Sequence, residues 1–220
     1  EKGFDVSKKG PRDLVTNVDK ASEKLIIKAI KKEFPDHGIL AEESENDLEE
    51  LASKEFIWII DPIDGTTNFA HGIPNYSISI AVFATTAQEH SKNFAYKAGE
   101  LIAGVVHAPR LKETFYAAKD KGAFLNGKKI QVSNTKTISE SVIATGFPYE
   151  GKEDVLPYFN KIVKRAQGIR RFGSAALDLC YVAAGRFDAY WEFNGKPWDI
   201  AAGALIVREA GGTLTDTNGA

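Results

Sequence analysis

The sequence is poor in the features that mark secreted and membrane proteins. Cys180 is its only cysteine, so no internal disulfide can form and a metal site built on several thiolates is excluded. No apolar run approaches the roughly 18 residues of a membrane-spanning helix, and no signal peptide opens the chain. Proteins without disulfides are typical of reducing compartments. We therefore expect a cytoplasmic protein that does not contact membranes.

An excess of charge of one sign is also absent. Lys and Arg number 28 against 30 Asp and Glu, which gives a formal net charge of −2 at pH 7. Nucleic acids and anionic membranes are bound by clustered positive charge. The charge balance therefore predicts no direct binding of nucleic acid.

The overall composition suits a folded core. The chain has 220 residues, of which 43% are hydrophobic and 26% charged, the balance of an ordinary globular protein of one or two domains. It begins at Glu1 rather than Met and ends in the turn-like residues Asp216 to Ala220. We therefore expect it to be a segment of a longer protein.

Hydrophobic periodicity predicts both helices and strands. Apolar residues recur at helical spacing after Val18, which predicts an amphipathic helix capped by Asn17 or Asp19 and running to Pro35. The apolar run 56–60 predicts a strand buried on both faces. We expect further strands at 76–83, 101–107, 113–118, 141–145 and 187–192, a hairpin turn at 126–127, and helices at 153–166, 174–184 and 197–210. This order predicts a layered α/β fold with mixed sheets, in which the polar stretch 85–100 is an exposed connection.

Two carboxylates follow the buried strand in the segment Asp61-Pro62-Ile63-Asp64-Gly65-Thr66-Thr67. We expect a sharp turn here and a short helix from Thr66, at the strand end where open α/β sheets bind ligands. Carboxylates about 4 Å apart repel each other by about 4 kcal/mol at an effective dielectric constant of about 20. A divalent cation removes this repulsion, and oxygen ligands favour magnesium, manganese or calcium over zinc. An aspartate-rich turn without a ligand is the alternative.

Other acidic positions are ambiguous when each is taken alone. For Glu42 and Glu43 the alternative to a functional role is a position on the solvated surface. Asp199 lies in the first turn of a helix that is apolar almost all round, where the helix dipole alone favours an acid. Asp19 begins the first helix, where capping is the default role of aspartate. The combination of these acids, rather than any one of them, indicates a function.

The motifs Asp61 to Phe69, Glu42-Glu43-Ser44 and Trp198 to Gly203 together resemble the inositol monophosphatase family. The similarity extends through Asp13 to Thr16 and Gly173 to Ala176. The resemblance implies a layered αβαβα sandwich of the inositol monophosphatase and fructose-1,6-bisphosphatase type, with residues 1–220 as a single catalytic domain. Because family members extend further at both ends, we expect N-terminal and C-terminal family segments to be missing.

The resemblance also implies a role for individual residues. The implied metal ligands, for two to three Mg²⁺ ions, are Glu42, Asp61, the Ile63 carbonyl, Asp64 and Asp199, with Glu43 holding outer-shell waters. The implied catalytic residues are Asp19, Thr66 and Glu42, of which Asp19 and Thr66 help to activate the attacking water. Phosphate is expected at the backbone N–H groups of Gly65 and Thr66. The implied substrate contacts are Asp64, Gly173, Ser174, Ala175, Glu192 and Asp199.

The activity that this resemblance implies is magnesium-dependent hydrolysis of a small phosphate monoester by a metal-activated water. This reaction leaves little covalent chemistry to a side chain. Inositol 1-phosphate is the expected substrate, and histidinol phosphate, fructose 1,6-bisphosphate and adenosine 3′,5′-bisphosphate are the alternatives. Lithium sensitivity and a homodimer are further family expectations. Because a bacterial branch of the family acts in RNA processing and transcription, a scaffold with such a partner is the alternative from another class.

Overall fold

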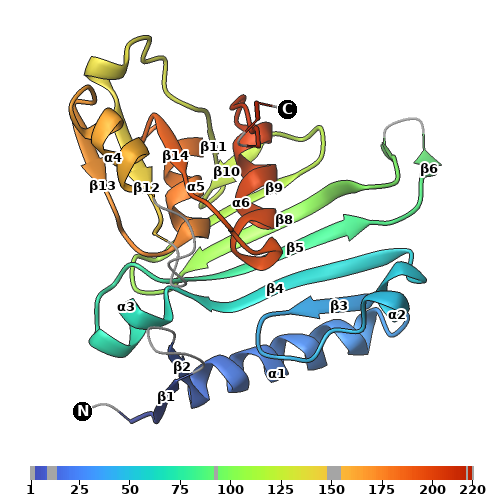
Figure 1. Ribbon diagram of the computed structural model, residues 1–220. Helices are drawn as coiled ribbons and strands as arrows, with labels where there is room; N and C mark the ends of the chain where they lie inside the picture. The colour runs from blue at the N-terminus through green and yellow to red at the C-terminus, as the bar shows by residue number, and fades with distance from the viewer. Residues whose placement is uncertain (1–2, 9–13, 92–93, 148–154, 217, 220) are drawn as a thin grey trace.

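The larger sheet of the protein is mixed, as predicted. The computed structural model describes residues 3–8, 14–91, 94–147, 155–216 and 218–219. The strands of this sheet are β3 (Gly38–Ala41), β4 (Phe56–Asp64), β5 (Ser77–Ala84), β8 (Glu100–Ala108), β9 (Glu113–Ala118), β10 (Ala123–Leu125) and β11 (Lys128–Ile130). Their spatial order is β11-β10-β9-β8-β5-β4-β3 (Figure 1). Neighbouring strands are antiparallel except for β3 and β4, which are parallel.

A smaller parallel sheet and several helices complete the described structure. In this sheet β12 (Val142–Thr145) lies between β13 (Gly168–Arg170) and β14 (Ala189–Trp191). Two separate antiparallel pairs are formed by β1 (Val6–Lys8) with β2 (Leu14–Thr16) and by β6 (Gln88–Ser91) with β7 (Phe94–Tyr96). The helices are α1 (Asn17–Glu33), α2 (Leu48–Ala52), α3 (Thr66–His71), α4 (Leu156–Val163), α5 (Ala175–Ala183) and α6 (Pro197–Glu209), with a 3₁₀ turn at Ile138–Glu140.

The side chains of β4 connect two helical layers, because successive side chains of a strand point to opposite faces of its sheet. Ile59 packs in the main core with residues of α5 and α6. Ile60 packs on the other face, with Ile30 of α1. Helix α5 contacts both β8 and β14 and so lies between the two sheets, and α4 lies along the smaller sheet (Figure 1). This layering confirms the predicted αβαβα sandwich.

Helix α1 is capped by Thr16, so the predicted caps Asn17 and Asp19 are wrong. The Thr16 hydroxyl accepts hydrogen bonds from the amides of Val18 and Asp19. The Asp19 carboxylate accepts in return from the Thr16 amide at 2.9 Å. This capping box satisfies two backbone donors reciprocally, which a single aspartate cap would not do. It also buries Asp19 completely.

The predicted sharp turn at Asp61 to Gly65 is wrong, because β4 continues to Asp64. Opposite β5, Asp61 pairs with Ser79 and Asp64 with Ser77, so β4 has one extra residue between the two aspartates. Pro62 has no backbone N–H to contribute to the ladder. The Ile63 amide instead donates to Asp61 Oδ1 at 2.9 Å. The result is a bulged strand end, with α3 beginning at Thr66 as predicted.

The remaining expectations differ mainly at the element ends. The other predicted strands and the helices around 175–183 and 197–209 are observed within about two residues of their expected bounds. The stretch 85–100, expected to be an exposed connection, contains the strand pair β6 and β7. The predicted start of a helix at Glu153 lies outside the described residues, and α4 ends at Val163, before the expected end at Ala166.

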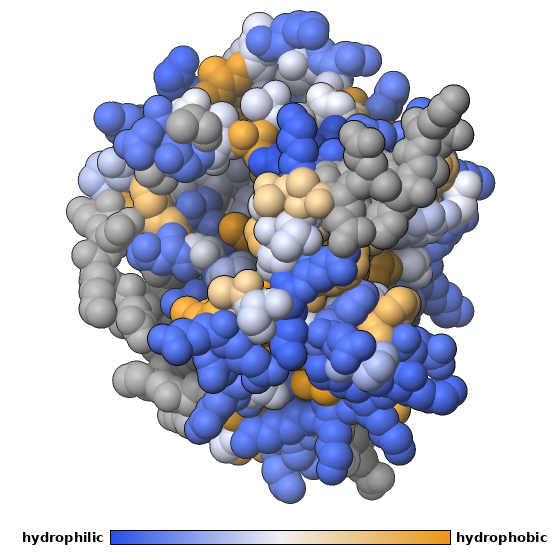
Figure 2. Space-filling view, turned by 90° about the vertical axis from the view of Figure 1, so that its right-hand side faces the viewer, coloured by the Kyte–Doolittle hydropathy of each residue, from blue (hydrophilic) through white to orange (hydrophobic). Residues whose placement is uncertain are grey.

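The described surface and core agree with the composition. No helix among the described residues is long and apolar enough to cross a membrane. On the face shown in Figure 2 hydrophilic residues predominate, and the apolar residues lie in small groups. Cys180 is buried in the main core of apolar residues, where it is a small packing residue.

Candidate active site

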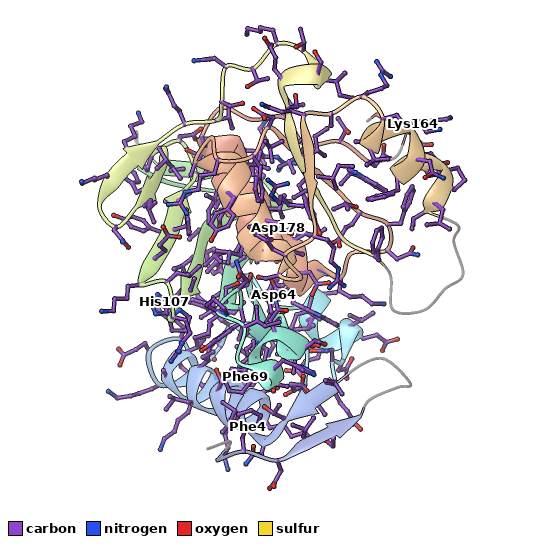
Figure 3. The ribbon with its side chains drawn as sticks, turned by 90° about the vertical axis from the view of Figure 1, so that its left-hand side faces the viewer. Phe4, Asp64, Phe69, His107, Lys164 and Asp178 are labelled. Atoms are coloured by element: carbon purple, nitrogen blue, oxygen red, sulfur yellow. The ribbon has the colours of Figure 1, made fainter. Side chains whose placement is uncertain are left out.

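One pocket at the end of β4 collects acidic residues from elements far apart in the sequence. Strand β4 contributes Asp61 and Asp64, the chain after β3 contributes Glu42, and the first turn of α6 contributes Asp199. Six of the described lining residues are acidic and one is basic; they are Glu42, Asp61, Asp64, Asp178, Glu192, Asp199 and Arg171. Asp64 and Asp178 lie near the centre of the molecule (Figure 3). Of the acids whose combination indicated a function, Glu42, Asp61, Asp64 and Asp199 therefore share one site, and Asp19 and Glu43 are not among the residues that line it.

Burial and mutual repulsion raise the pKa of both β4 aspartates. Burial is the largest cause of the raised pKa of Asp61, followed by repulsion from Glu42, Asp64 and Asp199. Burial also raises the pKa of Asp64 well above its usual range, with repulsion from Asp199 next. These shifts show that the carboxyl groups interact electrostatically across one pocket.

Asp64 is anchored at the N-terminus of α5. Its Oδ2 accepts from Ser174 Oγ at 2.6 Å and from the Ala176 amide at 2.7 Å, and its Oδ1 accepts from the Ala175 amide at 3.2 Å. The partial positive charge of a helix N-terminus stabilises a carboxylate there. Ser174 and Ala175, which the resemblance implies as substrate contacts, line the pocket and also hold Asp64 in position.

Asp19 and Thr66 are in direct hydrogen-bond contact. Thr66 Oγ1 lies 2.9 Å from Asp19 Oδ1 and 3.0 Å from the Ile63 carbonyl oxygen. A hydroxyl donates only one proton, so Thr66 donates to one of these two acceptors at a time. Donation to Asp19 leaves a lone pair of Thr66 Oγ1 to accept a hydrogen bond from a water. The role of the pair in activating that water stays a prediction.

Two glycines allow α3 to approach the chain before α5. Gly65 has φ +93°, and a Cβ at this position would lie 2.9 Å from the Gly173 carbonyl oxygen. Gly173 itself has φ +81°. A side chain at either position would strain the backbone, and at Gly65 it would also collide with the neighbouring chain. The expected phosphate and substrate segments therefore lie side by side because glycine occupies both positions.

Two supporting residues were not found from the sequence. The Asn68 side-chain amide donates to the carbonyl oxygens of Asn75 and Phe172, both at 2.6 Å, and so ties α3 to the chain before α5. The buried Glu23 of α1 accepts from the Glu43 amide at 2.8 Å and holds the segment that carries Glu42. Glu23 follows Asp19 by one helical turn, and this spacing was the available signal. The Glu43 side chain lines a hollow along α1 rather than the acidic pocket.

The remaining acidic residues line the pocket beside β14. Burial raises the pKa of Glu192, while a hydrogen bond from Tyr190 and the charge of Arg171 oppose this shift. Asp178 of α5 was also missed from the sequence. Burial and repulsion from Glu192 raise the pKa of Asp178 to about 8. An acid inside a predicted buried helix was the signal that could have identified it.

The donor set suits a hard cation in its chemistry. All the predicted ligands offer oxygen, which magnesium and calcium prefer, and a cation would relieve the repulsion that raises the pKa of Asp61 and Asp64. Among the described residues, however, no group of three or more His, Cys, Asp or Glu side chains is arranged to hold a metal ion. Asp61 and Asp64 accept hydrogen bonds from backbone amides. These bonds leave lone pairs on both carboxylates that could coordinate a cation.

The fold and the site define a layered α/β protein with an acidic, oxygen-lined pocket at the end of a central strand. The chain belongs to the inositol monophosphatase family, whose family model matches residues 1–220. It is 42% identical over 219 residues to the Nus factor SuhB of Pseudomonas aeruginosa, a match that covers 97% of this chain and 76% of that protein.

Solved structures agree with this assignment. The extragenic suppressor protein suhB from Bartonella henselae superposes with a TM-score of 0.87 at 42% identity, covering 99% of this chain and 79% of that chain. An IMPase/NADP phosphatase complexed with Mg²⁺ and phosphate superposes with a TM-score of 0.81 at 28% identity, covering 95% of this chain and 73% of that chain. The predicted family and fold are confirmed, and the protein has a phosphatase fold.

Asp61→Asn should raise the free energy of unfolding when divalent cations are removed. The folded-state pKa of Asp61 is raised above its ordinary value of 3.8, so ionisation of this group destabilises the folded protein. The penalty is absent below the ordinary value and grows as pH rises toward the folded-state pKa. The stabilisation by Asn should therefore be larger at pH 8 than at pH 5, measured by urea unfolding in EDTA.

Asp188→Asn is the matched control. Burial raises the pKa of Asp188, but hydrogen bonds from Ser133, Thr135 and Val142 outweigh it, and the net pKa is lowered. Loss of this carboxylate should therefore lower the free energy of unfolding at neutral pH. If Asp61→Asn destabilised the protein at pH 8 as Asp188→Asn does, repulsion in the pocket would not be the governing interaction.

Proposed function

We propose that this protein is a magnesium-dependent phosphatase that hydrolyses a small phosphate monoester. The observation that carries the proposal is the convergence of Glu42, Asp61, Asp64 and Asp199 on one pocket. The Asp19–Thr66 hydrogen bond lies at the same strand end. Membership of the inositol monophosphatase family supports the same function, as do the Mg²⁺ and phosphate of the related IMPase/NADP phosphatase complex.

The proposed metal ligands are the residues implied by the family motifs. Glu42, Asp61, the Ile63 carbonyl, Asp64 and Asp199 would hold two to three Mg²⁺ ions, whereas Glu43, implied by the motif as an outer-shell residue, is not among the residues that line the pocket. When bound, magnesium neutralises the carboxylates, polarises the phosphate and makes water a better nucleophile. Asp64 enters this set already positioned by α5.

The residues of the chain itself bind the phosphate and orient the water. The backbone N–H groups of Gly65 and Thr66 would donate to the phosphate oxygens. Asp19 accepts a hydrogen bond from the Thr66 hydroxyl, so Thr66 Oγ1 would accept a hydrogen bond from the attacking water and orient it for in-line attack. Glu42, whose carboxyl is hydrogen-bonded to that of Asp61, is the third proposed catalytic residue.

Inositol 1-phosphate is the proposed substrate. Gly173, Ser174, Ala175 and Glu192 line the pocket beside Asp64 and Asp199, where they would contact the hydroxyl groups of the leaving group. Histidinol phosphate, fructose 1,6-bisphosphate and adenosine 3′,5′-bisphosphate are the alternative substrates. A cytoplasmic homodimer that is inhibited by lithium belongs to the same proposal.

Phosphate release from a panel of esters tests the reaction and the substrate together. With Mg²⁺, release from inositol 1-phosphate should exceed release from the three alternatives, and EDTA should lower it by about a hundredfold or more. Excess Mg²⁺ should restore it. Faster release from an alternative would overturn the substrate but leave the reaction, whereas no release from any ester would overturn the phosphatase.

Asp199→Asn should lower kcat by about a hundredfold or more, because one proposed ligand loses its charge. The fold should persist, because Asn can still accept the hydrogen bond that Asp199 Oδ2 accepts from the Lys196 amide. Glu209→Gln is the control at the other end of α6, where Glu209 accepts from the amides of Asp120 and Gly122. Its kcat should change little. Activity of Asp199→Asn close to that of the wild type would remove Asp199 from the ligand set.

A second candidate function is a scaffold role in transcription or RNA processing. The supporting observation is the name of the Pseudomonas aeruginosa relative, Nus factor SuhB. Such a role would use a protein partner rather than direct binding of nucleic acid, because the chain has a net charge of −2.

Capture of purified RNA-polymerase-associated factors separates the two functions. Wild type and Asp64→Asn, each verified as folded by circular dichroism, should retain the same factors if the scaffold role exists, although Asp64→Asn loses phosphatase activity. Failure of both proteins to retain any factor would contradict the scaffold. Loss in Asp64→Asn alone would instead link partner binding to the pocket.

A further inference from the structure

Two carboxyl oxygens at the pocket lack a hydrogen-bond partner. Asp178 Oδ1 and Glu192 Oε1 are both buried, and the described residues supply a donor to neither. Asp178 lies in α5 and Glu192 directly follows β14, yet both line the acidic pocket. Buried polar atoms are rarely left unpaired in folded proteins. Two such atoms at one pocket therefore point to a ligand that satisfies them.

The other oxygen of each carboxyl is engaged. Asp178 accepts a hydrogen bond from the Phe172 amide, and Glu192 is hydrogen-bonded to Tyr190. Asp178 is only 1% exposed, so bulk water does not replace the absent donor. Since both residues line the pocket, the pocket is the place from which a donor can reach them.

The charges around Asp178 favour a neutral partner. Glu192 repels the ionised form of Asp178. Arg171, the one basic residue among the described residues that line the pocket, attracts it. Burial and repulsion from Glu192 raise the pKa of Asp178 to about 8, so near neutral pH its carboxyl holds a proton. A protonated carboxyl both donates and accepts hydrogen bonds, as an alcohol hydroxyl does.

We propose that Asp178 is a specificity-determining residue that acts with Glu192 to select a leaving group bearing neighbouring hydroxyl groups. The inference rests on the proposed phosphatase function and adds a residue to which the family motifs gave no role. A polyol satisfies both buried oxygens, whereas a leaving group without hydroxyls leaves them unpaired. Sites built to bind a hydroxyl discriminate strongly against analogues that lack it.

The test compares kcat/KM for inositol 1-phosphate with kcat/KM for phenyl phosphate, whose leaving group has no further hydroxyls. Asp178→Val removes the polar atoms at similar size and should lower the ratio of the two constants by about tenfold or more. Phenyl phosphate hydrolysis itself should change by less than about threefold. Asp178→Asn keeps an acceptor and a donor and should retain the wild-type ratio, as should the control Asp188→Asn outside the pocket.

Each outcome has a defined meaning. An unchanged ratio of the two constants in Asp178→Val would overturn the inference. Both constants would fall equally if the role of Asp178 were structural, and neither would change if Asp178 had no role. If wild-type protein released no phosphate from either ester, the proposed function would fail instead.

Competition in the wild-type protein covers the case in which Asp178→Val does not fold. Free inositol and cyclohexanol would be compared as inhibitors of phenyl phosphate hydrolysis. Inositol should inhibit at a concentration at least about tenfold lower than that of cyclohexanol, because it supplies the hydroxyl groups that cyclohexanol lacks. Equal inhibition by the two would overturn the selection of hydroxyl groups.

Discussion

Electrostatic repulsion among Glu42, Asp61, Asp64 and Asp199 is the constraint under which the rest of the pocket is built. Burial by itself disfavours ionisation of Asp61 and Asp64, and repulsion from the neighbouring carboxylates adds to the effect. A fold selected only for stability would separate or neutralise them. This fold instead holds Asp64 on the first amides of α5, so that part of the repulsion is offset by favourable contacts. Such a concentration of like charge is typical of a functional site and costs stability.

Hydrogen bonds across long sequence separations hold the pocket together. Thr66 joins α3 to Asp19 of α1, and Asn68 joins α3 to the chain before α5. The short helix α3 therefore lies where the N-terminal helix, the end of β4 and the start of α5 meet. The glycines at 65 and 173 permit the close approach of these segments. A shift in any of them would move carboxylates that come from different parts of the chain.

Local patterns accounted for most of the elements, the error at the cap of α1 is itself local, and long-range contacts account for the site residues that were missed. The strand at 56–60 and the helix at 197–210 were predictable because their apolar residues are contiguous or periodic. The cap of α1 was misassigned to Asn17 or Asp19, because a capping box depends on which residue adopts the extended backbone conformation. Helical spacing and an acid in a buried helix marked Glu23 and Asp178, but the roles of these two residues and of Asn68 depend on partners or neighbours that are distant in sequence.

The amino-acid sequence alone determined the chemistry available to this protein: oxygen ligands, near-neutral charge, and acidic motifs that resemble one family. These properties follow from residue types and their local order. Only the tertiary structure decided that Asp19 bonds Thr66, that Asp64 is anchored by α5, and that Asp178 and Glu192 each keep an unpaired oxygen. The physical reason is that hydrogen bonding, burial and repulsion depend on distances that are established when the sheets and helices pack together.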